Sequence, residues 1–206
     1  MVKDERDKKL RILAAADLHG SSSIAEKLAE KAEKNKVDLV VLAGDIHGMF
    51  EGERVIEPFK KRHQKVIFVP GNWDTSLEVS MLKDVHKIKN IDGYYVNYNG
   101  VDIIGVGNPD FDLSLENKKI FDKIKKNFDR IRAKDNRKIL VSHMHARGTK
   151  AEFSGIKGSK ILREAIERFK PDVFISAHIH EAEGIEEKIG KTKVVQVGRS
   201  GKVIEI

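Results

Sequence analysis

The sequence predicts an α/β fold in which two β-sheets pack face to face with helices on their outer sides. Three observations support this prediction. Apolar runs alternate with amphipathic segments in the first half of the chain, as in proteins whose helices cover a parallel sheet. Residues 37–43 are almost continuously apolar, which is typical of a strand covered on both faces. Two hairpin patterns then interrupt the alternation, so a second sheet is expected.

Three strands, each followed by a helix, account for the first half of the chain. The predicted strands cover residues 10–16, 37–43 and 65–69, and the predicted helices cover residues 23–35, 53–62 and 75–85. Ser23 and Glu26 have the spacing of a capping box, in which a hydroxyl and a carboxylate cap the first turn reciprocally. Thr75 and Glu78 repeat this spacing, so the first and third of these helices have a defined start.

The second half of the chain begins with a hairpin signal. Asn99 and Gly100 separate two strand-like runs, and this dipeptide favours the primed turn of a two-residue hairpin. The remaining predicted elements are strands at 94–98, 101–106, 139–142 and 173–177, a helix at 159–169, and a second hairpin over 185–197. These elements complete the second sheet and part of its helical cover.

Length and composition set limits on the class of protein. A chain of 206 residues is long enough for one extended core, so we expect a single domain over residues 1–206. The chain has no cysteine, so a metal would have to be held by nitrogen and oxygen atoms. It has no run of 18 apolar residues and no apolar segment near its start, from which we expect a cytoplasmic protein with no membrane contact.

The excess positive charge comes from one segment. The chain has 39 Lys and Arg against 32 Asp and Glu, a net charge of +7. Residues 118–138 contain ten Lys or Arg and three Asp, which equals the whole excess. Leu115, Ile120, Ile124 and Phe128 recur in this region at helical spacing. We therefore predict an amphipathic helix with a solvated basic face and keep nucleic-acid contact as the less favoured alternative.

Metal-binding residue types gather where the predicted strands end. Each of five strands is followed by carboxylate, amide or imidazole side chains, and in an open α/β fold such strand ends share one crevice. These residues are Asp17 and His19, Asp45, Asn72, His143, and His178 with His180. A soluble domain has reason to collect so many polar ligands at strand ends when they bind a metal or a reacting phosphate.

The spacing of two pairs predicts how their side chains point. Asp17 and His19 are one residue apart, as are His178 and His180, so on a continued strand each pair would face the same way and converge on one ion. Asp45 has two carboxylate oxygens and could bridge two cations. Taken alone, Asp45 could equally be a turn or helix-capping residue.

Two further candidates have ordinary alternatives when considered singly. Asn72 can position a phosphoryl oxygen or bind a metal weakly, although Pro-Gly-Asn is also a common turn sequence. His143 follows an apolar run and could be a buried core histidine. It is the joint occurrence of all five groups that favours a site.

The order of these motifs resembles that of the calcineurin-like metallophosphoesterases. Asp-x-His, Gly-Asp, Gly-Asn-x-Asp, a single His and then His-x-His follow one another over about residues 10–200. The resemblance implies a four-layer α/β/β/α sandwich with a dinuclear metal site at the strand ends, of the compact microbial phosphodiesterase kind. The two implied ligand sets share Asp45, and they are Asp17, His19, Asp45 and His180 for one ion and Asp45, Asn72, His143 and His178 for the other.

The same resemblance implies the reaction. A hydroxide that bridges two divalent ions would attack a phosphoester, with Asp45 and Asn72 as the catalytic residues. Manganese is the expected metal, with nickel, zinc, iron or cobalt as alternatives. A non-catalytic metal-binding scaffold of the same fold is the alternative function. The oligomeric state is open.

One position departs from the family pattern and bears on the substrate. Many members have histidine after Gly-Asn, where it protonates the leaving oxygen or holds the phosphate, whereas this chain has Trp73. Indole cannot transfer a proton in this way. Unless His145, His47 or Asp74 replaces that histidine, a small phosphodiester or nucleotide is favoured over an alkyl monoester.

Other residues near the motifs are assigned from the sequence as follows. Trp73 and His145 are predicted to contact substrate together with Asn72, although Trp73 could also be a rim residue and His145 a loop residue. Ala177 stands where the family usually has glycine, a change that we expect to be tolerated. We interpret Arg199 as part of a surface turn, with phosphate contact as the alternative.

Overall fold

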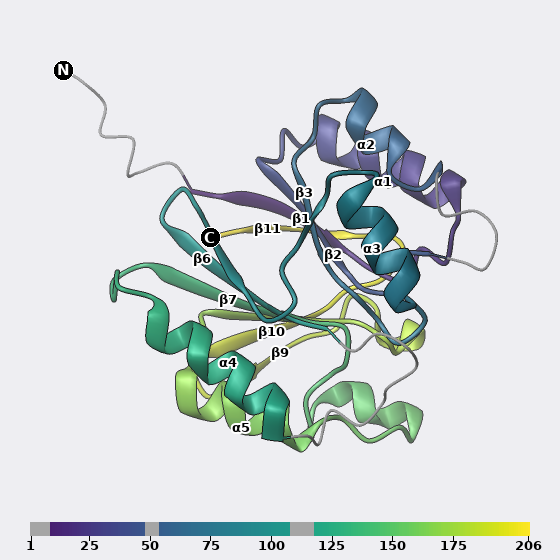
Figure 1. Ribbon diagram of the computed structural model, residues 1–206. Coiled ribbons are helices and arrows are strands. Elements are labelled where there is room, and N and C mark those ends of the chain that lie inside the picture. Colours follow the sequence, from purple (N-terminus) through teal and green to yellow (C-terminus); the bar gives the residue numbers. More distant parts are fainter. Residues whose placement is uncertain (1–8, 48–53, 108–117) are drawn as a thin grey trace.

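The computed structural model describes residues 9–47, 54–107 and 118–206, which form two β-sheets between outer helices (Figure 1). The first sheet has the strand order β11-β1-β2-β3-β4. In it β1, β2, β3 and β4 are parallel, and β11 pairs with β1 in the antiparallel direction. Its strands are β1 (Arg11–Ala15), β2 (Leu39–Ala43), β3 (Val66–Val69), β4 (Lys89–Asn90) and β11 (Lys202–Glu205).

The second sheet has the strand order β5-β6-β7-β8-β10-β9. Its four central strands run parallel, and antiparallel hairpin partners form both edges. Asn99 and Gly100 form the predicted turn between β5 and β6, with φ of 48° and 78°. The strands are β5 (Tyr95–Tyr98), β6 (Val101–Val106), β7 (Arg137–Ser142), β8 (Val173–Ser176), β9 (Glu186–Ile189) and β10 (Thr192–Gln196).

Alternating strand residues separate the layers. In β1, Ile12 and Ala14 belong to the core between the sheets, whereas Leu13 belongs to the core under the helices. Helices α1 (Ser22–Lys34), α2 (Glu57–Lys61) and α3 (Ser76–Asp84) lie on the first sheet, and α4 (Lys118–Arg130) and α5 (Lys160–Phe169) lie on the second (Figure 1). The predicted α/β/β/α sandwich is therefore confirmed.

Two helix predictions need correction. The cap of α1 is Ser21, whose side chain accepts a hydrogen bond from the backbone N–H of Ile24, so the predicted box at Ser23 is wrong. Helix α2 is shorter than predicted, because it begins next to Pro58, a residue suited to the first helical turn; position 53 lies outside the described residues. The capping box of Thr75 and Glu78 on α3 is present.

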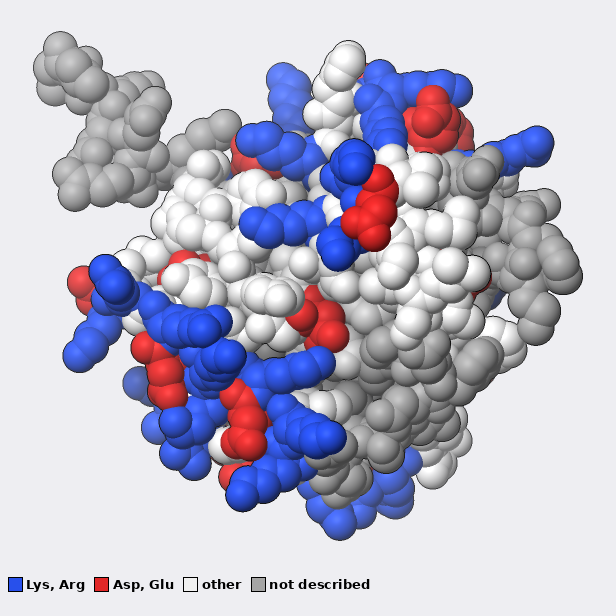
Figure 2. Space-filling model, viewed as in Figure 1, with Lys and Arg blue, Asp and Glu red and all other residues white. Residues whose placement is uncertain are grey.

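The basic segment forms α4, an amphipathic helix as predicted. Ile120 and Ile124 are buried against the second sheet, and the ring of Phe128 stacks on Phe169 of α5 with centroids 4.7 Å apart. Lys and Arg side chains gather on the outer side of α4 and α5 (Figure 2). Leu115 lies outside the described residues. No helix in the described part of the chain is long and apolar enough to cross a membrane.

Candidate metal centre

The two sheets meet at the carboxyl ends of their parallel strands. His143, which follows β7, lies with its Nδ1 2.8 Å from the backbone oxygen of Ala43 at the end of β2. A carbonyl oxygen only accepts, so Nδ1 donates this hydrogen bond and Nε2 faces the opposite way. The end of the second sheet therefore reaches the crevice formed by the first.

The predicted ligands lie on loops that follow the strands, and not on continued strands. Strands β1 and β8 end before the motifs, and Asp17, His19, Asp45 and His178 have positive φ values of 59°, 44°, 51° and 72°. The prediction that each His-x-His or Asp-x-His pair points along one strand face is therefore wrong. Left-handed conformations are uncommon for residues other than glycine, although Asp and His adopt them more often than most, and they cluster at functional sites, where the surrounding structure enforces them.

The loops bring the ligand atoms into two overlapping groups. Asp17, His19 and His180 form one group, and Asp17, Asp45 and His143 form the other, with the ligand atoms of each group within 4.8 Å of one another. Asp45 also connects the groups, because its Oδ2 is 3.2 Å from Nε2 of His143 and 3.9 Å from Nε2 of His19. Nε2 of His180 is 3.4 Å from Oδ1 of Asp17.

His178 and Asn72 lie beside the second group. The ring of His178 meets that of His143 edge to face, with centroids 5.2 Å apart. Asn72 is buried, and the next residue, Trp73, donates its backbone N–H to Oδ1 of Asp45 at 2.9 Å. The structure thus groups the ligand atoms of five predicted ligands, with the His178 ring beside His143 and Asn72 next to a residue that donates to Asp45.

Unsatisfied polar atoms test whether these residues fit a cation. Both carboxylate oxygens of Asp17 and Oδ1 of Asn72 are buried and accept no hydrogen bond from the described residues. Buried polar groups without a partner are costly, so each such group needs a ligand or water. Carboxylate, amide and imidazole atoms are suitable donors for divalent transition metals. The donor set therefore fits divalent cations.

Burial and charge shift the pKa values of the cluster in opposite directions. Burial raises the pKa of Asp17 to about 6 and, with the charge of His143, lowers that of His178 to about 4. Burial also lowers the pKa of His19. For His143 the effect of burial is outweighed by the hydrogen bond and charge of Asp45, which raise its pKa to about 9, while His143 holds the pKa of Asp45 low despite burial. A proton on Nε2 of His143 therefore stands where a cation would bind.

We expect metal affinity to rise with pH. Below about pH 9 the metal-free protein carries this proton on His143, and a ligating imidazole must lose it, so metal binding releases a proton. The apparent Kd for Mn²⁺ should fall by about tenfold per pH unit between pH 6.5 and 8.5. Calorimetric titration of metal-stripped protein at several pH values measures this, and equal Kd values at pH 6.5 and 8.5 would contradict it.

Asp74 fixes the loops that carry Asp45 and Asn72. It is fully buried, and its Oδ1 accepts the backbone N–H groups of Ile46 and His47 at 2.9 and 3.0 Å, while Oδ2 accepts that of Gly71 at 2.8 Å. We did not predict this positioning role. Its sequence signal is the carboxylate that closes the Gly-Asn-x-Asp motif.

Three other predicted or considered residues border the centre. The ring of His145 is buried and parallel to that of His178, with centroids 6.4 Å apart and Nε2 3.2 Å from the backbone oxygen of Ile156. Trp73 is half exposed and meets the ring of His19 edge-on at 5.9 Å. Arg199 lies in an exposed turn, as predicted, and its Nε donates to the backbone oxygen of Asp17 at 2.8 Å.

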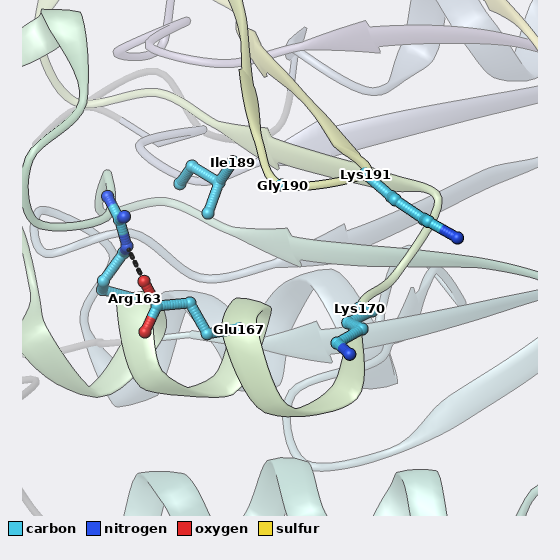
Figure 3. Close-up of a pocket in the computed structure, with 6 residues that line it drawn as sticks. All are labelled: Arg163, Glu167, Lys170, Ile189, Gly190 and Lys191. Carbon is cyan, nitrogen blue, oxygen red and sulfur yellow. Dashed lines mark hydrogen bonds and ion pairs between the residues drawn. The ribbon is translucent and has the colours of Figure 1, made fainter.

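A separate pocket lies away from these residues, between α5 and the β9–β10 turn (Figure 3). Arg163 and Glu167 form an ion pair of 2.6 Å within it, and Lys191 extends away from that pair (Figure 3). None of the predicted site residues lines it.

Comparison with solved structures supports the fold. A protein of Thermus thermophilus superposes with a TM-score of 0.73 at 20% identity, covering 94% of this chain and 91% of that one. An archaeal phosphodiesterase gives 0.55 at 17% identity, covering 95% and 99%. A purple acid phosphatase from yellow lupin gives 0.65 at 12% identity, covering 98% of this chain but 46% of the larger enzyme.

The sequence comparison identifies the family. No curated protein sequence matches the chain. A family profile described as calcineurin-like phosphoesterase matches residues 10–182, which include all seven predicted ligands. With this match over most of its length, the chain belongs to the calcineurin-like phosphoesterase family.

Proposed function

We propose that the protein is a metal-dependent phosphodiesterase acting on a small phosphodiester or nucleotide. Two divalent ions would be held by the seven predicted ligands, manganese being the expected metal and nickel, zinc, iron or cobalt the alternatives. The observation that carries the choice of diester is Trp73, which occupies the position of the proton-donating histidine found in many relatives.

The protein's own residues have separable roles in this proposal. When bound, two divalent ions supply a hydroxide nucleophile at neutral pH and neutralise charge on the phosphoryl oxygens. Asp45 would contact both ions, since Oδ2 lies beside His19 and His143 while Oδ1 is held by the N–H of Trp73. Asn72 presents a buried side-chain oxygen and an amide that can donate to a phosphoryl oxygen. Asp74 holds the loops that carry Asp45 and Asn72 through hydrogen bonds to their backbone.

None of the three considered substitutes is arranged as a proton donor. The carboxylate of Asp74 already accepts three backbone N–H groups. His47 is buried, with Nδ1 directed at Glu78 of α3 at 3.8 Å. Nε2 of His145 must carry its proton toward the Ile156 carbonyl, so in the neutral ring Nδ1 is an acceptor. An alkyl alkoxide would leave unassisted, which favours diesters and better leaving groups.

Trp73→His tests this argument. A correctly placed general acid contributes about 10²- to 10⁴-fold, so the variant should raise kcat/KM for glycerol 2-phosphate by at least about tenfold. Phosphate release by the manganese-loaded protein measures it. Trp73→Phe removes the indole without adding a proton donor and should bring no gain. If Trp73→His gains nothing on this monoester, or Trp73→Phe gains as much, the lack of a proton donor at position 73 does not explain a preference for diesters.

Two other expectations remain predictions. The cytoplasmic location rests on sequence composition, and the preference for a small substrate over nucleic acid rests on the solvated basic face of α4. The oligomeric state is open.

A further inference from the structure

A cationic cavity lies next to the candidate metal centre. It has a volume of about 370 Å³ and lies between helix α1 and the turn that joins β10 to β11. Three cationic and no acidic side chains are among the residues that line it, which are Ile24, Lys27, Leu28, Lys31, Arg199 and Ser200. Its volume falls within the range of small-ligand pockets.

Arg199 connects this cavity to the centre. Its Nε donates to the backbone oxygen of Asp17, a predicted metal ligand, at 2.8 Å. The turn that carries Arg199 is fixed from both sides, because Lys31 donates to the carbonyl oxygen of Ser200 at 2.9 Å and Glu183 accepts the N–H of Ser200 at 2.7 Å. The guanidinium is thus held in place through one of its five N–H groups. Its terminal nitrogens donate no hydrogen bond to the described residues, so they can bind an anion.

The electrostatic surroundings favour a negative group. Ile24 belongs to the first turn of α1, which contains no acidic residue to compensate the positive end of the helix dipole. Lys27, one turn further, is exposed and pairs with no acid in the described part of the chain. Burial is the main cause of the pKa shifts of Asp17 and His19, since it raises the pKa of Asp17 and lowers that of His19. The positive charge of Arg199 acts to lower both pKa values, so Arg199 interacts electrostatically with the centre.

We propose that this cavity is a subsite for a second phosphate of the substrate, held by Arg199 and Lys27 while the scissile phosphodiester lies at the metal centre. This inference rests on the proposed function. Guanidinium groups bind phosphate in a bidentate manner, and the partly exposed apolar side chain of Ile24 can contact the sugar that joins the two phosphates. The substrate class is therefore a nucleotide ester that carries an additional phosphate.

The test compares two substrates that share one scissile bond. These are the p-nitrophenyl ester of thymidine 5′-phosphate and the same ester with a 3′-phosphate. Charge-assisted hydrogen bonds of this kind correspond to about 10- to 100-fold in affinity, so kcat/KM of the manganese-loaded protein should be higher for the 3′-phosphorylated ester by about that factor. Arg199→Ala and Lys27→Ala should each reduce this ratio at least threefold. Lys34→Ala, on the last turn of the same helix, should leave the ratio unchanged.

Binding gives an independent measurement. Metal-free protein should bind thymidine 3′,5′-bisphosphate at least about tenfold more tightly than thymidine 5′-phosphate, and Lys27→Ala should reduce the difference. Equal affinities, together with a kcat/KM ratio near one, would overturn the subsite. Equal loss of activity on both esters in Arg199→Ala, with no effect of Lys27→Ala, would also overturn it and leave Arg199 only a role in holding Asp17. If neither ester is hydrolysed, the proposed function fails, and the binding comparison still decides the subsite.

Discussion

Replacing Asp45 with alanine is expected to lower kcat/KM for bis(p-nitrophenyl) phosphate by at least about 1,000-fold, which corresponds to about 4 kcal/mol of transition-state stabilisation. Asp45 is the carboxylate nearest to both His19 and His143, with Oδ2 at 3.9 and 3.2 Å. Without it, the second ligand group loses a carboxylate, the contact between this carboxylate and His19 of the first group is lost, and the charge that balances His143 is removed. Initial rates of manganese-loaded protein measure the effect.

Asp84→Ala is the matched control for this variant. Asp84 is an exposed aspartate at the end of α3, paired with Lys83 at 3.7 Å, and its removal should leave the rate unchanged. Activity that survives Asp45→Ala within tenfold of wild type would refute the site assignment. A wild-type protein that is inactive with every metal would instead favour the scaffold alternative.

A single added methyl group at Gly71 is expected to lower the same kcat/KM by about 100-fold, because displacements of about 1 Å in a catalytic group cost that much. A Cβ on Gly71 would overlap Oδ1 and the backbone nitrogen of Asp45, neither of which can move without disturbing the centre. Gly71→Ala therefore tests the placement of the Asp45 carboxylate while leaving its chemistry intact. Kinetics and thermal unfolding should be measured together.

Gly100→Ala separates local strain from this effect. Gly100 lies in the β5–β6 turn with φ of 78°, and an added Cβ meets no atom within 4 Å. It should lower the free energy of unfolding by about 1 kcal/mol through backbone strain and leave kcat/KM unchanged. Full activity of Gly71→Ala would show that the position of Asp45 is not critical.

The layer order could be predicted because burial leaves a strong pattern in the sequence. Strand β2 is covered on both faces and is therefore continuously apolar. Strands β4 and β11 were missed, since β4 has two residues and β11 is a short run with two exposed charged residues. The cap of α1 was misplaced because Ser21, Ser22 and Ser23 are chemically identical, and only the backbone geometry selects Ser21.

The composition of the candidate site could be predicted, but its geometry could not. Motif order identified the seven ligand candidates, whereas the left-handed backbone at Asp17 and His178 depends on packing between loops. The role of Asp74 depends on N–H groups from two separate loops. Arg199 is held through Lys31, which precedes Ser200 by 169 residues, so no local pattern could indicate its orientation.

If the seven predicted ligands form a metal centre suited to phosphodiesters, hydrolysis should depend on a divalent ion and favour diesters. Metal-stripped protein, reconstituted with Mn²⁺, should be assayed on bis(p-nitrophenyl) phosphate and p-nitrophenyl phosphate, which release the same leaving group. We expect metal-dependent hydrolysis with a higher kcat/KM for the diester. Hydrolysis that persists without metal, or a higher kcat/KM for the monoester, would contradict it.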